Sequence, residues 1–351
     1  MDREDRMSAT HAAAQLDAEV VAKYLEAHVE GFRGPVTFEK TPTGQSNPTF
    51  ILTSPSGKYV LRRKPPGTLL KSAHAVDREF RVQKALAGSD VPTAHMYHLC
   101  EDEDVIGSIF YVMECVEGEV HFDPRLQDKT NAWRSAMFDD MNRVLAALHD
   151  VDYKAVGLET FGKPGSYFER QVGRWSKQFY AAQTRPLPQM DELIQWLQDN
   201  MPADDGITTL VHGDYRIDNM IYSSAEPKVL AVLDWELSTL GHPYSDLAYQ
   251  CMQWRMPPGL ETRGFGDQDR TELGIPSEQE YVEKYCERRG LGGIPIFGFC
   301  LAFSFFRMAA IVEGVLRRGL DGNASNPERA LKMGEYVPEF ARRGLEATLE
   351  A

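Results

Sequence analysis

The segment LVHGDYRIDNMIY, residues 210–222, is the feature that most constrains the fold of this chain. It holds a histidine, two aspartates, an arginine and an asparagine between two apolar ends. This pattern predicts a sharp loop between two buried strands, held in place by hydrogen bonds among its own polar groups. A second apolar run, VLAVLDWE at residues 229–236, follows at hairpin distance and predicts a further strand.

The polar residues of this loop have the spacing of a kinase catalytic loop. Asp214 and Asn219 form a D-x4-N unit, in which the aspartate accepts the proton of a substrate hydroxyl and the asparagine binds a metal. A short hairpin would return Asp234 to a place beside Asn219. Carboxylate and amide oxygens are hard ligands that suit Mg2+ with nucleotide phosphates. Asp214 is then left to orient and deprotonate an attacking hydroxyl.

A structural interpretation of the same loop is the alternative. Asp and Asn side chains often do no more than form Asx turns, and a D-x4-N spacing alone occurs by chance. The HGD-x4-N pattern between apolar strands, with LDWE at hairpin distance, favours catalysis. For two further residues we expect a structural role only. Asp218 is expected to be solvated or turn-forming, and His212 to hydrogen-bond neighbouring backbone.

The rest of the sequence predicts an α+β fold of two lobes. After a helical segment at 16–30, residues 36–115 show short β-like runs and one helical stretch, in the order β-β-β-α-β-β. Beyond Gly118 the pattern is mostly helical. The sequence therefore predicts a small antiparallel β-rich lobe at 1–115 and a larger, mostly helical lobe at 116–351. Further helices are expected at 130–152, 167–182, 190–199 and over most of 243–349.

Composition excludes several other classes of protein. The formal net charge is −14, whereas a general nucleic-acid binder needs a basic surface. The most apolar stretch, IPIFGFCLAFSFF, is shorter than the roughly 20 residues of a membrane span, so we expect a buried helix. The opening MDREDRMSAT lacks the apolar core of a secretory signal. Five cysteines without a CxxC motif argue against disulfides and zinc, which favours a cytoplasmic protein.

Taken together, these motifs resemble the aminoglycoside phosphotransferase and choline kinase superfamily, from about residue 36 to 320. HGDYRIDN and LDWE carry the resemblance most specifically. GQSNPTF, YVLRRKPPG, LDWELSTLGHPYSDLAY and FFRMAAIVEGV are similar to one subgroup, the kinase-like domains fused to or encoded beside some acyl-CoA dehydrogenases. The resemblance implies a bilobal protein-kinase-like fold, ATP as co-substrate, Mg2+ as cofactor and a functional link to an acyl-CoA dehydrogenase. We expect no dehydrogenase domain within this chain.

The resemblance also assigns residues to the nucleotide. Arg62, in YVLRRK, stands where the family has a strand cation that contacts the phosphates, and it departs from the lysine of protein kinases. Glu79, in VDREF, is the expected helix partner of Arg62. Arg63 and Lys64 are expected at the surface. The loop over the phosphates lacks GxGxxG, and the groups expected to contact phosphate there belong to Gly44, Gln45, Ser46 and Asn47.

YVMECVEG resembles the hinge between the two lobes. By this resemblance, the carbonyl of Glu114 accepts from the adenine amino group and the N–H of Val116 donates to a ring nitrogen. Met113 would line the space behind the adenine or belong to the core. Asp246, in YSDLAY, is expected to brace the catalytic loop rather than to act in catalysis.

The function predicted from the sequence is ATP-dependent phosphorylation of a small-molecule hydroxyl. A hydroxyacyl-CoA or hydroxy acid is the favoured acceptor. The subgroup resemblance points to such a compound, and the apolar run FGFCLAFSFF with Arg307, Arg317 and Arg318 suits an acyl chain bearing a carboxylate or CoA phosphates. The alternative interpretation is that most of this run is core and that the arginines belong to a solvated face. An aminoglycoside or amino-alcohol kinase is the second possibility. A catalytically silent, nucleotide-binding pseudokinase is another, against which Asp214, Asn219 and Asp234 speak together. The strand-rich start argues against an acyl-CoA dehydrogenase.

Overall fold

The computed structural model describes residues 16–41, 47–65, 75–258, 264–265, 270–324 and 326–351. The chain divides into two compact units. Unit 1 comprises Met1–Ala87, Thr93–Glu117 and Asp234–Glu236, and unit 2 comprises Gly88–Pro92, Gly118–Leu233 and Leu237–Ala351. The short segment Asp234–Glu236 thus belongs to the sheet-containing unit, although the sequence had placed it in the helical lobe.

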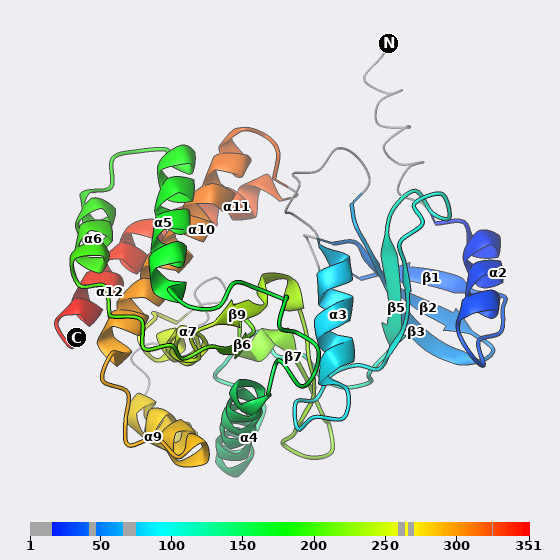
Figure 1. Ribbon diagram of the computed structural model, residues 1–351, viewed down its shortest axis with the longest axis horizontal. Helices are drawn as coiled ribbons and strands as arrows, with labels where there is room; N and C mark the ends of the chain where they lie inside the picture. The colour runs from blue at the N-terminus through cyan, green and yellow to red at the C-terminus, as the bar shows by residue number, and fades with distance from the viewer. Residues whose placement is uncertain (1–15, 42–46, 66–74, 259–263, 266–269, 325) are drawn as a thin grey trace. The chain divides into compact units, whose positions relative to one another are not determined.

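Unit 1 is built on a five-stranded antiparallel sheet with the strand order β1-β2-β3-β5-β4. A tight hairpin joins β2 to β3, with Ser54 opposite Gly57. Together with α3 (Val76–Leu86), this confirms the predicted order β-β-β-α-β-β (Figure 1). The strands are β1 (Thr37–Lys40), β2 (Thr49–Ser54), β3 (Gly57–Arg63), β4 (Met96–Cys100) and β5 (Phe110–Glu114).

Both faces of this sheet are covered, because side chains alternate along each strand. Phe110 and Val112 pack with the apolar side of α2 (Ala18–His28). Tyr111 and Met113, the alternate residues of β5, pack with apolar residues of α3. Arg62 lies opposite Tyr111 in the β3–β5 register, so its side chain projects toward the α3 face.

Unit 2 is mostly helical, with two small antiparallel strand pairs. Strand β6 pairs with β9, and β7 pairs with β8 in a hairpin. The elements are α4 (Asn131–Asp150), α5 (Tyr167–Ala182), α6 (Pro188–Asp199), β6 (Thr209–Val211), η1 (Ile217–Asn219), β7 (Met220–Tyr222), β8 (Val229–Val232), β9 (Thr239–Gly241), α7 (Tyr244–Cys251), η3 (Met252–Trp254), α8 (Arg270–Leu273), α9 (Glu278–Arg289), α10 (Phe297–Leu320), α11 (Pro327–Gly334) and α12 (Val337–Thr348).

Helix α10 forms the centre of unit 2 and packs against α5, α7, α11 and α12 (Figure 1). Its first half is apolar on every side, as expected for a helix enclosed by others, and residues 298–307 are all buried. Within the described ranges, α10 is the one helix long and apolar enough to cross a membrane, and 78% of its apolar 18-residue window is buried inside the protein. The prediction of a buried core helix is confirmed.

Two local predictions were wrong. Arg63 is not at the surface, because odd-numbered residues of β3 face α2; its side chain is buried and its guanidinium lies 5.7 Å from the ring centre of Phe50. This burial lowers the pKa of Arg63. The run 229–236 is not a single strand either, since β8 ends at Val232 and the 3-10 helix η2 (Trp235–Leu237) follows.

Candidate active site

The loop that follows β6 is anchored by Asp246 of helix α7. Its Oδ2 accepts a hydrogen bond from the His212 N–H at 2.6 Å, and its Oδ1 accepts one from the Gly213 N–H at 2.8 Å. The carboxylate is fully buried, and the Nε2 of His149 lies 3.4 Å from Oδ2. Burial alone would raise the pKa of Asp246, but His149 and the backbone donor outweigh it, and the pKa is lowered. The contacts confirm the expected bracing by Asp246; the part of His149 was not predicted.

Both ring nitrogens of His212 form hydrogen bonds with backbone groups in and beside this loop. Its Nδ1 accepts from the backbone N–H of Asp214 at 3.1 Å, and its Nε2 lies 2.8 Å from the carbonyl oxygen of Leu233. Because a carbonyl can only accept, these partners assign the proton to Nε2. Both nitrogens are occupied by backbone, so the expected structural role of His212 is confirmed.

Asp214 is held as an oriented, ionised carboxylate. The hydroxyl of Tyr249 donates to Oδ1 at 2.5 Å, and the amide nitrogen of Asn219 donates to Oδ2 at 2.8 Å. Burial would raise the pKa of Asp214, but the charge of Arg216 and the Tyr249 bond prevail and lower it. The carboxylate remains partly accessible, with 15% of the side chain exposed. A fixed, charged and accessible carboxylate is suited to accept a proton from a hydroxyl.

Asn219 presents the geometry expected of a metal ligand. Its amide nitrogen donates to both the carbonyl and the Oδ2 of Asp214, which leaves the amide oxygen, the atom that Mg2+ prefers, outside these contacts. The β7–β8 hairpin returns the chain to this residue, since the Leu233 N–H donates to the Asn219 carbonyl at 2.8 Å. Asp234 is the next residue along the chain.

The donor set fits Mg2+ better than a tightly caged metal. Among the residues that the structure describes, no group of three or more His, Cys, Asp or Glu side chains could hold a metal ion. Mg2+ is typically bound by one or two protein oxygens, together with waters and substrate phosphates. The predicted ligands Asn219 and Asp234 would supply one amide and one carboxylate oxygen for this mode of binding.

Gly213 and Arg307 complete the support of the loop. Gly213 has φ +85°, and a Cβ there would lie 2.7 Å from the carbonyl oxygen of Leu237, so only glycine fits. Arg307 of α10 donates to the Gly213 carbonyl. Its guanidinium also lies 5.5 Å from the ring centre of Tyr249 and 5.8 Å from that of Trp175. A single arginine within an apolar helix was the available signal for this role.

Arg216 links two carboxylates of the loop. Its Nη2 lies 3.3 Å from Oδ2 of Asp214, and its Nε lies 3.3 Å from Oδ1 of Asp218. Asp218 was expected to be solvated or turn-forming; it is not solvated, since it lies in η1 with its side chain buried beside this arginine. Neither Arg216 nor Tyr249 was identified from the sequence.

Unit 1 contains the residues that were predicted to contact the nucleotide phosphates. Arg62 is buried, and its Nε lies 3.0 Å from Oε2 of Glu79, as expected for the strand–helix ion pair. Glu79 also accepts from the amide of Asn47 at 2.7 Å and from the hydroxyl of Tyr111 at 3.1 Å. Burial lowers the pKa of Arg62, but Glu79 and Asp234 outweigh it and raise the pKa overall, so Arg62 remains a cation.

Asp234 adopts a left-handed backbone conformation, with φ +61°. This region is disfavoured for most non-glycine residues, although aspartate and asparagine enter it more readily than the others. Its Oδ1 accepts from Nη2 of Arg62 at 2.8 Å. Strained residues of this kind often occur at functional sites, where the surrounding structure fixes them.

The remaining predicted nucleotide contacts stay predictions. Gly44, Gln45 and Ser46 lie outside the described residues, and the side chain of Asn47 is bonded to Glu79. At the hinge, the Glu114 N–H donates to the His95 carbonyl. The N–H of Val116 makes no hydrogen bond within the described part of the chain, so it is available to a ligand.

Comparison with known proteins identifies the relatives of this chain. The family model for the phosphotransferase enzyme family matches residues 37–280. Acyl-CoA dehydrogenase family member 10 of Mus musculus is 46% identical over 90% of this chain and 30% of its own length. Acyl-CoA dehydrogenase family member 11 of Homo sapiens is 40% identical over 95% of this chain and 43% of its own length. The chain thus spans less than half of these curated relatives.

Solved structures show the same architecture. A candidate aminoglycoside phosphotransferase from Ralstonia eutropha is 48% identical, with a TM-score of 0.88 over 96% of this chain and 99% of that one. Aminoglycoside phosphotransferase APH(4)-Ia, in a complex with ADP and hygromycin B, shares the fold at 15% identity and a TM-score of 0.59, over 93% and 98% of the two chains. The chain belongs to the phosphotransferase enzyme family and has the protein-kinase-like fold of the aminoglycoside phosphotransferases.

Proposed function

We propose that the protein is an ATP-dependent phosphotransferase that moves the γ-phosphate to a hydroxyl of a small molecule, with a hydroxyacyl-CoA or hydroxy acid as acceptor. The observation that carries the proposal is the state of Asp214. It is ionised, partly accessible, and fixed on both carboxylate oxygens by Tyr249 and Asn219. A pseudokinase has no use for such a group, and a base of this kind contributes about 10²–10⁴-fold to a rate.

Each residue of the site has a separate role in phosphoryl transfer. Asp214 orients the acceptor hydroxyl and takes its proton as the bond to phosphorus forms. Asn219 and Asp234 would hold Mg2+, which neutralises phosphate charge when bound. Arg62 supplies a permanent cation for the nucleotide phosphates, kept in its orientation by Glu79. Positioning and charge neutralisation account for catalysis in this class, without a covalent enzyme intermediate.

The names of the relatives support an acyl-CoA compound as acceptor. Two of the curated proteins that match 90–95% of this chain are called acyl-CoA dehydrogenase family members, and they extend well beyond the matched segment. We expect a phosphotransferase segment within such a protein to act on the same class of compound. A hydroxyl on the acyl chain would be its acceptor.

The contacts of α10 favour the alternative interpretation of its apolar run, core packing, over a wall of the acceptor site. The run FGFCLAFSFF is core, with residues 298–306 buried among neighbouring helices. Arg307 is buried against the catalytic loop, and exposed Arg317 lies 3.5 Å from Asp321 of its own helix. These residues therefore do not form an acyl-binding wall with free cations. Most of the apolar side chains are buried in the core, Arg307 contacts the catalytic loop, and Arg317 lies beside Asp321.

The test is a measurement of ADP release from ATP and Mg2+ with a panel of acceptors. The panel contains hydroxyacyl-CoA thioesters with the hydroxyl at different carbons, the free hydroxy acids, and kanamycin. We expect stimulation by a hydroxyacyl-CoA or hydroxy acid, formation of its phosphate ester, and loss of both in Asp214→Asn. If kanamycin were phosphorylated instead, the acceptor would be an aminoglycoside and not an acyl compound. Nucleotide binding without turnover on any acceptor would favour a pseudokinase.

A further inference from the structure

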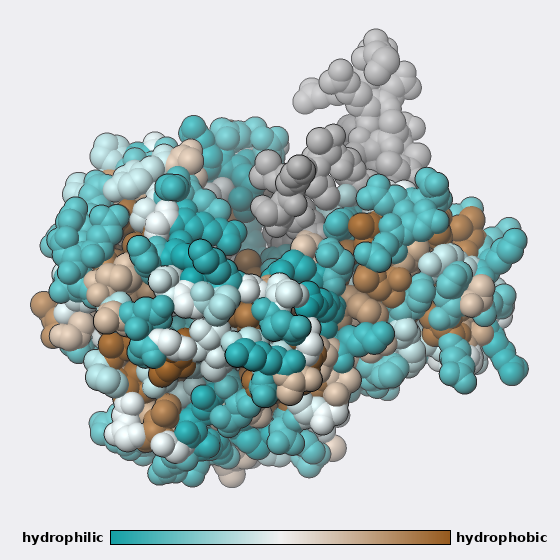
Figure 2. All heavy atoms as spheres, viewed as in Figure 1, coloured by the Kyte–Doolittle hydropathy of each residue, from teal (hydrophilic) through white to brown (hydrophobic). Residues whose placement is uncertain are grey.

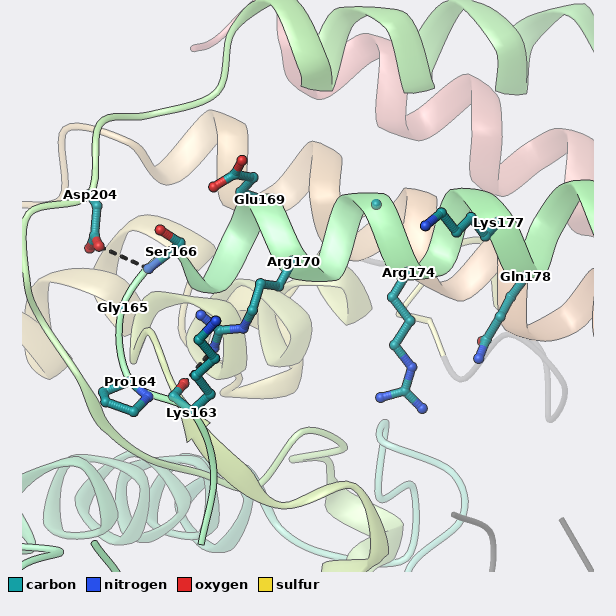
Figure 3. A pocket seen from close by; sticks show the side chains of 11 residues that line it. Lys163, Pro164, Gly165, Ser166, Glu169, Arg170, Arg174, Lys177, Gln178 and Asp204 are labelled. Atoms are coloured by element: carbon teal, nitrogen blue, oxygen red, sulfur yellow. Dashed lines mark hydrogen bonds between the residues drawn. The ribbon is translucent and has the colours of Figure 1, made fainter. Parts of the chain in front are cut away.

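Unit 2 contains a pocket of about 900 Å³ along the first turns of helix α5. This volume lies within the range of small-molecule sites, about 300–1,000 Å³. The pocket is formed by α5, by the loop that precedes it and by Asp204 of a more distant loop (Figure 3). Figure 2 shows that the surface over α5 is hydrophilic. The pocket residues with charged side chains are Lys163, Glu169, Arg170, Arg174, Lys177 and Asp204.

The pocket is cationic although the chain as a whole carries a net charge of −14. Four of its side chains are basic and two are acidic. One of the acids, Asp204, is engaged by backbone, since Oδ2 accepts from the Ser166 N–H at 2.8 Å and Oδ1 from the Gly206 N–H at 3.1 Å. In the described part of the chain, none of the four basic side chains forms an ion pair. Their mutual repulsion makes an anion a favourable occupant.

Arg170 provides the most specific indication of a ligand. Its Nη2 donates to the carbonyl of Lys163 at 2.5 Å, which fixes the guanidinium at the pocket. Its Nη1 is buried and has no hydrogen-bond partner among the described residues. A buried donor without an acceptor is destabilising, and an oxyanion would satisfy it. Figure 3 shows Arg170 and Arg174 projecting from the same side of α5, with Lys163 beside Arg170, whereas Glu169 points away.

The pocket is connected to the catalytic loop within the same unit. The guanidinium of Arg174 lies 5.4 Å from the ring centre of Trp175, and that of Arg307 lies 5.8 Å from the same ring. Arg307 in turn donates to the Gly213 carbonyl, next to Asp214. An elongated acceptor could therefore place an anionic end at Arg174 and a hydroxyl at Asp214.

We infer that this pocket binds phosphate groups at the far end of the acceptor molecule, as the phosphorylated ADP portion of a CoA thioester would provide. The inference rests on the proposed function, because it assigns the pocket to the acceptor of that reaction. Arg170 supplies the buried donor, and Lys163, Arg174 and Lys177 supply the surrounding charge. A phosphate-free, polycationic acceptor would be repelled here.

The test compares phosphate-bearing and phosphate-free probes by calorimetry, with the nucleotide site filled by AMP-PNP and Mg2+. The probes are coenzyme A, 3′-dephospho-coenzyme A, pantetheine and inorganic pyrophosphate. Lys163→Ala/Arg174→Ala removes two exposed cations from the pocket and should preserve the fold. Lys284→Ala/Lys332→Ala removes the same charge from α9 and α11 and is the matched control. We expect the pocket variant to bind coenzyme A about 10–100-fold more weakly, with pantetheine unaffected and the control unchanged.

The outcomes separate this inference from the proposed function. If the pocket variant bound coenzyme A as tightly as wild type, the pocket assignment would fall even if hydroxyacyl-CoA phosphorylation were found. If pyrophosphate alone bound in a variant-sensitive way, the pocket would hold free anions and not the acceptor. If coenzyme A bound here but no acyl compound were phosphorylated, the proposed function would fail and the pocket would stand.

Discussion

The guanidinium of Arg62 lies 2.8 Å from the carboxylate of Asp234, a residue 172 positions further along the chain. Arg62 is simultaneously paired with Glu79 through Nε, so one cation is shared by two carboxylates. A planar guanidinium can hold two such partners in fixed directions, whereas an ammonium group offers a single point charge. This sharing is a physical reason for arginine at position 62, since lysine could not hold both carboxylates in the same directions.

We predict that Arg62→Lys weakens both stability and nucleotide binding. The lysine keeps the positive charge but cannot contact Glu79 and Asp234 with the same geometry. The buried carboxylate of Glu79 then loses part of the charge interaction that offsets its removal from water. We expect a loss of about 1–3 kcal/mol in the free energy of unfolding, measured by urea denaturation, together with a higher KM for ATP. Arg63→Lys, a matched change on the opposite face of β3, should leave the KM unchanged. An equal effect of both substitutions on KM would contradict the role of Arg62.

A second prediction concerns Asp234, where two substitutions separate the effect of the side-chain charge from the effect of the backbone conformation. Asp234→Ala removes the proposed ligand and places alanine at φ +61°. Asp234→Asn removes the charge but keeps a residue that tolerates this region. We expect both variants to lose the Mg2+-dependent part of ATP binding, measured by calorimetry in Mg2+ and in EDTA. Both variants lose the ion pair with Arg62, and the alanine variant should lose more stability because its backbone conformation is also unfavourable. A wild-type difference between Mg2+ and EDTA in the asparagine variant would exclude Asp234 as a ligand.

The local parts of the fold and site could be predicted from the sequence. The periodicity of residues 16–30 and 75–88 gave α2 and α3, because an apolar stripe is visible within one element. The D-x4-N unit was equally recognisable, since Asp214 and Asn219 are joined by one short loop. Their direct hydrogen bond at 2.8 Å is a consequence of that spacing.

Other parts of the site depend on contacts between distant segments and could not be predicted. Tyr249 reaches Asp214 across 35 positions, and Arg307 reaches Gly213 across 94. Nothing in YSDLAYQC distinguishes Tyr249 from an ordinary core side chain, and the single arginine of FSFFRMAA marks Arg307 as unusual without indicating its partner. Their direction is set by the packing of α7 and α10, which a single sequence does not specify.

Gly213 leads to a prediction about the loop alone. A methyl group there meets the Leu237 carbonyl at 2.7 Å, and φ +85° is unfavourable for alanine. We expect Gly213→Ala to cost roughly 1–3 kcal/mol of stability and to lower kcat, because Asp214 follows directly in the chain. Gly292→Ala, at an exposed position where a Cβ has no neighbour within 4 Å, is the control and should be neutral or slightly stabilising. Wild-type kcat and stability in Gly213→Ala would refute this account of the loop.

Asp214→Asn should separate chemistry from binding. The asparagine is nearly isosteric but cannot accept the hydroxyl proton, so kcat should fall by about 10²–10⁴-fold. Nucleotide affinity should change little, because the proposed metal ligands are Asn219 and Asp234. Single-turnover kinetics with the identified acceptor and calorimetry with AMP-PNP measure the two effects. Activity within a few-fold of wild type would remove Asp214 from the role of base.

The pH dependence of the reaction tests the environment of Asp214 more closely. Burial would raise its pKa, but Arg216, together with the hydrogen bond from Tyr249, lowers it below the ordinary value of an aspartate. A carboxylate with a lowered pKa stays ionised until the pH falls through that lowered value. The wild-type kcat/KM should therefore show no acid limb from Asp214 above the ordinary aspartate range.

Tyr249→Phe removes one of the interactions that lower this pKa, while the burial that raises it remains. The Asp214 pKa must then increase, and the acid limb of kcat/KM should move to higher pH. At high pH, where Asp214 is ionised in both proteins, the two rates should approach each other if the hydroxyl acts mainly through the charge of Asp214. Tyr244→Phe, another buried tyrosine of α7, is the matched control and should leave the profile in place. A pH-independent loss of activity in Tyr249→Phe would show that Tyr249 positions the carboxylate without setting its pKa.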